Sequence, residues 1–175
     1  MKITVDIGHN VPPDGGAVDI GNENVMNLAV GNHLISMLVK AGVQVIPCRP
    51  LKASSVNDSL RQRVNTANEA NADYFVSIHH NAGGGRGCEV FYVGNFGCTL
   101  AVEVCKQLAN LGFNNRGAKY KKFFVLNKTK MPAILVETCF VDTQSDMNLW
   151  NRVGAEAVAK AIYDGLNTVL KFDKS

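Results

Sequence analysis

The sequence lacks the patterns that mark several classes of protein. Its five cysteines form no Cys-x-x-Cys pair and their number is odd, so we expect free thiols rather than a disulfide framework. Basic residues form no long run, and the formal net charge is only +3, which argues against a dedicated nucleic-acid-binding protein. No segment is long and apolar enough to span a membrane, so we expect no membrane insertion.

The motifs of two common enzyme classes are missing as well. The glycine-rich stretches at residues 14–16 and 83–87 lack the lysine and the hydroxyl side chain of a phosphate-binding loop. No Gly-x-Ser-x-Gly segment is present to hold a nucleophilic serine on a sharp turn. The first residues pass straight into an apolar run, without a signal core or a cleavage site.

The composition that remains is typical of one folded domain. The 175 residues are 46% hydrophobic and 19% charged, without repeats, low-complexity stretches or linkers. We expect a single domain over residues 1–175, with its core in residues 1–170 and a frayed tail or the start of a linker at 171–175. Apolar runs of strand length alternate with helical stretches, which predicts an α/β fold with a mostly parallel sheet and helices on both faces.

The predicted elements follow from the spacing of apolar residues. Strands are expected at residues 3–7, 43–48, 74–78, 88–93, 123–126 and 133–136. Helices are expected at residues 24–41, from 57 or 58 to about 67, at about 100–111 and at about 153–170. The apolar stripe of the first helix is expected to comprise Val25, Leu28, Ile35 and Val39.

Reactive side chains follow three of these strands at the point where each strand ends. His9 follows the first strand, the pair His79–His80 follows the third, and Glu137 follows the last. Glu23 begins the first helix, close to His9 in the chain. Because the carboxyl ends of parallel strands meet at one edge of a sheet, we expect these groups to lie close together.

Such a group of side chains has a known chemistry. Two histidines and a carboxylate form a catalytic zinc set with a position open to water, whose pKa the metal lowers. A further carboxylate can then take the proton of that water and pass it to a leaving group. We therefore expect His9, Glu23 and one of the two adjacent histidines to bind one zinc ion, and Glu137 to act as general base and acid.

Each residue also has an ordinary structural explanation. Glu23 could serve only to favour the positive end of its helix. Glu137 follows four apolar residues, and a buried carboxylate there could instead form a salt bridge with Arg49 or Arg63. A cysteine hydrolase built on Cys139 is a further alternative, although a small apolar filler at the end of a strand is the more common use of such a residue.

Together these residues resemble the zinc-dependent N-acetylmuramoyl-L-alanine amidases of bacterial cell walls and phage endolysins. The resemblance runs in order along nearly the whole chain. It rests on the segments Asp6–His9, Asp14–Ala17 followed by Glu23, Arg63–Asn68, Ser77–Ala82, Asn115–Gly117 and Met131–Thr138. It implies a roughly six-stranded sheet and hydrolysis of the amide bond between N-acetylmuramic acid and L-alanine in peptidoglycan.

The resemblance also implies roles for single residues. It makes His79, rather than His80, the third zinc ligand, and it makes Glu137 the catalytic residue. Contact with substrate or support of the zinc ligands is expected of His80, Asn81, Arg63 and Asn10.

The sequence departs from the family pattern in three places. Asn10 stands where a glycine usually follows the histidine, and Cys139 replaces another usual glycine. The connection between His80 and Cys88 is short, and nothing in it resembles the inhibitory helix that some family members carry. We therefore expect an enzyme that needs no activator protein.

Two other functions are consistent with the same residues. A carboxypeptidase or deacetylase acting on wall peptides would use the same zinc ligands, whereas a wall-binding module would keep the fold without the chemistry. In each case the protein would act at the bacterial cell wall. We expect either cytoplasmic synthesis and release at lysis, as for a phage lysin, or a catalytic domain of a secreted protein whose wall-binding domain is missing.

Overall fold

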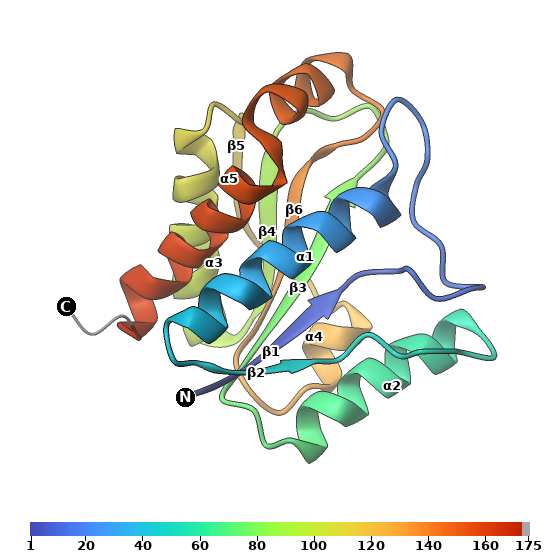
Figure 1. Ribbon diagram of the computed structural model, residues 1–175, viewed down its shortest axis with the longest axis vertical. Coiled ribbons are helices and arrows are strands. Elements are labelled where there is room, and N and C mark those ends of the chain that lie inside the picture. Colours follow the sequence, from blue (N-terminus) through green and yellow to red (C-terminus); the bar gives the residue numbers. More distant parts are fainter. Residues whose placement is uncertain (173–175) are drawn as a thin grey trace.

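A computed structural model describes residues 1–172 of the chain (Figure 1). Strands and helices alternate along most of the chain. In chain order the elements are β1 (Lys2–Ile7), α1 (Glu23–Lys40), β2 (Gln44–Pro47), α2 (Val56–Glu69), β3 (Tyr74–Asn81), β4 (Cys88–Val93), α3 (Gly94–Asn110), β5 (Asn115–Tyr120), α4 (Phe124–Lys128), β6 (Ala133–Phe140) and α5 (Gln144–Leu170).

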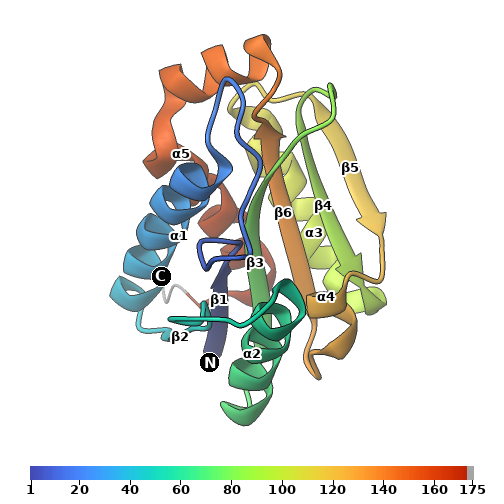
Figure 2. The same cartoon turned by 90° about the vertical axis from the view of Figure 1, so that its right-hand side faces the viewer.

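The strands form one six-stranded sheet in the order β2-β1-β3-β6-β4-β5. Strands β2, β1, β3 and β6 run parallel to one another. Strand β4 runs antiparallel to β6, and β5 lies parallel to β4 at the edge. Helices α1, α3 and α5 cover one face of the sheet, and α2 and α4 cover the other (Figures 1 and 2). The predicted α/β class and six-stranded, mostly parallel sheet are confirmed.

The two faces of the sheet bury two separate apolar clusters. The larger cluster lies under α1, α3 and α5, and the smaller one lies under α2 and α4. Strand β6 contributes to both, because successive side chains of a strand point to opposite faces. Ile134 and Val136 belong to the larger cluster, whereas Ala133 and Leu135 belong to the smaller one.

One predicted strand is wrong. Residues 123–126, expected as a strand, instead form the N-cap and first turn of the short helix α4, in which Val125 and Leu126 are buried. A run of four apolar residues cannot by itself be assigned to a strand or a helix. The strand that sequence patterns miss is β5, whose Asn115, Arg116 and Tyr120 are exposed at the sheet edge and give no apolar signal.

The apolar stripe predicted for α1 is shifted around the helix. Val25 and Val39 are 64% and 55% exposed, and the residues that face the sheet are Met26, Val30, Leu34 and Leu38. Both sets recur at helical spacing, so the pattern alone does not choose between them. Gly31 decides the orientation, because a Cβ at this position would lie 2.4 Å from the Ile7 side chain.

The last helix is longer than expected. It begins at Gln144 rather than near Val153, and it bends at Gly154, whose φ is 78°. Phe172, placed in the expected frayed tail, is buried, and its ring centroid lies 5.2 Å from that of Tyr163. Residues 173–175 lie outside the described residues.

Candidate metal and catalytic site

The turn after β1 presents His9 at the carboxyl edge of the sheet. His9 and Asn10 have positive φ angles of 55° and 64°, a conformation that asparagine adopts more readily than most residues. Asn10 stabilises the turn by donating hydrogen bonds from Nδ2 to the carbonyl oxygens of Gly8 and Asn24, each at 3.0 Å. Asn10, which stands where the family usually has a glycine, therefore links this turn to the start of α1 by a hydrogen bond.

Strand β3 places His79 against the same turn. A Cβ at Gly8 would lie 2.3 Å from the His79 ring, so only glycine allows the imidazole to pack against the end of β1. The rings of His9 and His79 meet edge to face, with their centroids 4.8 Å apart.

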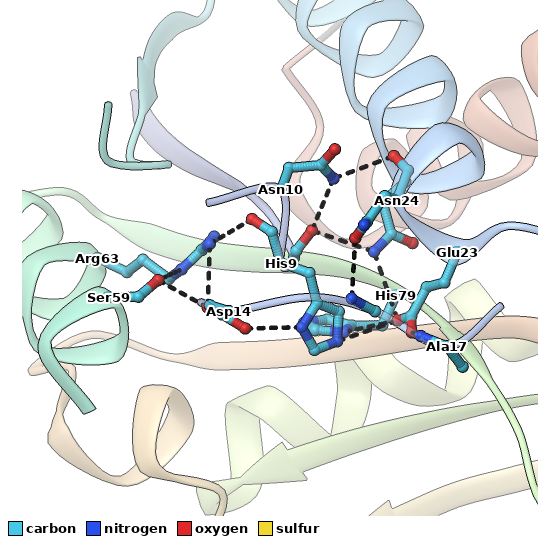
Figure 3. A network of polar contacts seen from close by, with 12 residues as sticks. His9, Asn10, Asp14, Ala17, Glu23, Asn24, Ser59, Arg63 and His79 are labelled. Atoms are coloured by element: carbon cyan, nitrogen blue, oxygen red, sulfur yellow. Dashed lines mark hydrogen bonds and ion pairs between the residues drawn. The ribbon is translucent and has the colours of Figure 1, made fainter. Parts of the chain in front are cut away.

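Glu23, the first residue of α1, completes the group (Figure 3). Its Oε1 lies 3.3 Å from Nε2 of His9 and 3.1 Å from Nδ1 of His79, and its Oε2 accepts a hydrogen bond from the Ala17 amide at 2.9 Å. One ligand atom from each of the three residues lies within 4.8 Å of the others, and no other such group occurs among residues 1–172. The structure thus brings together the three residues predicted to bind zinc.

Asp14 sets the orientation of His9. Its Oδ1 lies 2.8 Å from His9 Nδ1, and its Oδ2 accepts a hydrogen bond from Ser59 Oγ at 2.6 Å. A carboxylate that accepts the Nδ1 proton leaves Nε2 free to bind a metal, which is the usual arrangement around metal-bound histidines. Sequence patterns gave no sign of this role, because Asp14 and His9 lie in a loop without periodic spacing.

Arg63 of α2 stabilises the turn that follows β1. Its side chain is 1% exposed, and NH1 donates to Asp6 Oδ1 at 2.5 Å and to the Ile7 carbonyl at 2.6 Å. NH2 donates to the His9 carbonyl at 2.6 Å. Of the two roles expected for Arg63, its contacts match support of the metal site.

Glu137 lies beside His79 on the neighbouring strand β6. It lines a cavity of about 250 Å³ together with His9, His79 and Phe123. Its Oε2 is buried without a hydrogen-bond partner, and burial, together with the charges of Glu23 and Glu89, raises the pKa of its carboxyl well above the usual range. A carboxyl group in this state is suited to hold and release a proton.

The salt bridge considered as an alternative for Glu137 does not form. Arg63 pairs with Asp6 and Asp14, and Arg49 donates to the carbonyl oxygen of Asn10 at 3.3 Å. A larger hollow of about 780 Å³ lies between α1 and α5, but its lining contains none of the predicted site residues. Chemistry rather than volume therefore identifies the candidate site.

Comparisons with known proteins agree with this geometry. A family model described as N-acetylmuramoyl-L-alanine amidase matches residues 3–168. The chain belongs to this family. It is 34% identical over 173 residues to the N-acetylmuramoyl-L-alanine amidase LytC of Bacillus subtilis, and the matched region covers 93% of this chain and 34% of LytC. It is 33% identical over 180 residues to the amidase CwlM of Bacillus licheniformis, and the matched region covers 100% of this chain and 71% of CwlM.

Solved amidase structures share the whole fold. The catalytic domain of the CD27L endolysin, which targets Clostridia Difficile, superposes with a TM-score of 0.87 at 30% identity and covers 100% of this chain and 99% of that domain. The amidase AmiC2 of Nostoc punctiforme superposes with a TM-score of 0.86 at 32% identity, with coverage of 98% and 97%. Within residues 1–172, no helix combines the length and apolar character needed to cross a membrane.

Two further residues expected at the candidate site are not among those that line its cavity. His80 is 2% exposed, and its ring meets that of Trp150 edge to face, with centroids 4.9 Å apart. Its backbone amide donates to Glu23 Oε1 at 3.2 Å, which is a supporting contact. Asn81 donates from Nδ2 to Glu89 Oε1 at 2.7 Å, so its side chain is directed to β4.

A bulge in β6 separates Cys139 from the candidate site. His79 pairs with Glu137, but Asn81 pairs with Phe140, so β6 contains one extra residue between these pairs. Cys139 consequently belongs to the larger apolar cluster, on the opposite face from Leu135. Burial raises the pKa of its thiol, and all five cysteines are free. The geometry does not support a cysteine hydrolase.

Proposed function

We propose that this chain hydrolyses the amide bond between N-acetylmuramic acid and L-alanine in bacterial peptidoglycan, with one zinc ion held by His9, Glu23 and His79. The observation that carries the proposal is the convergence of three ligand atoms next to Glu137, in a member of the amidase family. The proposal concerns this chain, which spans about a third of LytC.

The chemistry of the donor atoms fits zinc. Two imidazole nitrogens and one carboxylate oxygen form a catalytic zinc set, and Asp14 fixes the tautomer of one imidazole. Although burial acts to lower it, hydrogen bonds to Asp14 and Glu23 raise the pKa of His9 to about 9. The site therefore attracts positive charge, which a zinc ion can supply in place of that proton.

Glu137 performs the proton transfers. Zinc bound at the three ligands would supply a Lewis acid for the scissile carbonyl and the attacking water. Burial raises the pKa of the Glu137 carboxyl, but the charge of a bound zinc ion would favour its ionised form. The Glu137 carboxylate then accepts a proton from the attacking water as the water oxygen bonds to the carbonyl carbon. Glu137 then gives that proton to the amide nitrogen as the carbon–nitrogen bond breaks. The products are a lactyl carboxylate on the sugar strand and a free amino group on L-alanine.

We propose the bacterial cell wall as the place of action. Relatives include a protein named endolysin from Bacillus phage SPP1, at 29% identity, and a protein named as a cell wall amidase from Bacillus anthracis, at 34% identity. Independence from an activator protein stays a prediction, which digestion by the purified chain alone tests.

The test is digestion of purified peptidoglycan by the zinc-loaded, chelator-treated and zinc-restored protein, with mass spectrometry of the products. We expect zinc-dependent release of stem peptides with a free L-alanine amino terminus, alongside sugar strands without peptide. Zinc-dependent release of a terminal amino acid or of acetate would replace this substrate assignment with a carboxypeptidase or a deacetylase. Cleavage that survives chelation would contradict the metal, and no cleavage would favour a wall-binding module.

A further inference from the structure

Lys121, between β5 and α4, holds an ammonium group at the rim of the catalytic cavity. Its Nζ lies 4.3 Å from the ring centroid of Phe123 and 5.2 Å from that of Phe91. These two rings meet edge to face with centroids 5.0 Å apart, and Phe123 lines the cavity that contains Glu137. The ammonium is therefore placed over an aromatic surface that continues into the cavity.

The backbone fixes Lys121 at this position. Its amide donates to the Tyr92 carbonyl at 3.2 Å, and its carbonyl accepts a hydrogen bond from the Phe123 amide at 3.0 Å. Figure 2 shows the chain passing from the end of β5 into α4 at this point. These hydrogen bonds hold the backbone of Lys121 at the sheet edge, from which its side chain places the ammonium over the two rings.

Two cations of the preceding strand β5 are already paired. Arg116 Nε lies 2.9 Å from Glu89 Oε2, and Lys119 forms an ion pair with the same oxygen. Within residues 1–172, Lys121 forms no salt bridge with a carboxylate. Its charge nevertheless acts on Glu137, where it opposes the larger effect of burial on the pKa. Lys121 is therefore an unpaired cation close to the catalytic carboxylate.

The distance from Glu137 to Phe91, over which the Lys121 ammonium lies, is similar to the length of a short peptide. Phe91, below the ammonium, pairs with Leu135, which lies two residues before Glu137 on the same face of β6. One strand spacing and two residues along a strand place the backbones of Phe91 and Glu137 about 8 Å apart, which is the length of about two residues of extended peptide. A peptide that runs from Glu137 towards Phe91 would bring a carboxylate about two residues from the cleaved bond towards the ammonium over this ring.

We propose that Lys121 binds a carboxylate of the stem peptide close to the cleaved amide, and so makes the enzyme select peptides that carry this charge. The inference rests on the proposed amidase function and adds a substrate preference to it. The Lys121 side chain is exposed, so its ammonium is open to a peptide, and it acts as a point charge over the two rings that lead to the cavity.

The test compares synthetic muramyl peptides whose second residue carries either a free α-carboxylate or the corresponding amide. A third peptide has the free α-carboxylate but an amide at its carboxyl terminus, which separates the two sources of negative charge. We expect the wild-type protein to prefer both peptides with the free α-carboxylate by about three- to tenfold in kcat/KM, mainly through KM. Lys121→Met should remove this preference, and Lys121→Arg should retain it.

Lys122→Met is the matched control, because Lys122 is an adjacent exposed lysine, and it should retain the preference. An equal loss of kcat/KM on all peptides in Lys121→Met, or a changed pH profile with an unchanged preference, would overturn the inference. If the zinc-loaded wild type cleaved none of the peptides, the proposed function would fail separately. Calorimetric binding of the free stem peptides would then decide: a carboxylate preference that Lys121→Met abolishes supports the subsite, and equal binding overturns it.

Discussion

At the scale of single residues, Asn27 and His80 connect the proposed metal site to the larger apolar cluster. The His80 Nδ1 atom lies 2.7 Å from Asn27 Oδ1, and burial lowers the pKa of His80 to about 3, so the ring is neutral. With its Oδ1 held in this way, Asn27 directs Nδ2 to Glu23 Oε1 at 3.4 Å and to the Gly8 carbonyl at 3.2 Å. The pair therefore orients Glu23 towards the two histidines.

Replacing either residue should weaken zinc binding. We expect His80→Ala and Asn27→Ala to lower zinc affinity by about 10- to 100-fold, the effect typical of groups that orient metal ligands. Competition with a coloured chelator measures the affinity, and circular dichroism checks the fold. His33→Ala, at an exposed position of α1, should bind zinc like the wild type. Wild-type affinity in both substituted proteins would show that Glu23 needs no such support.

At the scale of elements, the bulge in β6 decides which side chains reach the cavity. Without the extra residue, the alternation of a strand would place Cys139 on the same face as Glu137. With it, Cys139 is buried in the cluster beneath α3 and α5. The departure from the family pattern at this position therefore changes the core and leaves the cavity intact.

Thiol modification tests this placement. Native protein treated with iodoacetamide should react at the half-buried Cys98 and retain its activity, because Cys139 is fully buried and its thiol has a raised pKa. Peptide mapping identifies the labelled residues, and the Cys98→Ser protein shows whether any loss comes from that site. Loss of activity in proportion to labelling of Cys139 would contradict the assigned face.

The same scale explains which elements the sequence could predict. Strands β1, β3 and β6 are buried on both faces, so each reads as an apolar run, and each is followed by or ends in a polar side chain. Strand β5 carries no comparable signal because it is a polar edge strand, whereas the apolar run of helix α4 is too short to distinguish a helix from a strand. Asp14 and Asn27 escaped prediction because their partners become neighbours only in the folded chain.

At the scale of the whole molecule, the fold places four reactive side chains at one edge of the sheet. His9 follows β1, Glu23 begins α1, and His79 and Glu137 lie side by side in β3 and β6. The larger layer of helices fixes this edge from one side, while α2 and α4 border the cavity on the other. Metal binding and proton transfer are therefore assigned to different residues that share one site.

Parallel measurement of zinc content and hydrolysis in Glu137→Gln and His79→Ala tests this division most directly. Glu137→Gln should bind one zinc ion with wild-type affinity, while its hydrolysis of a muramyl peptide falls by about 10²- to 10⁴-fold, the range of general acid–base catalysis. His79→Ala should lose both the zinc and the activity. Full activity in Glu137→Gln, or tightly bound zinc in His79→Ala, would contradict the account.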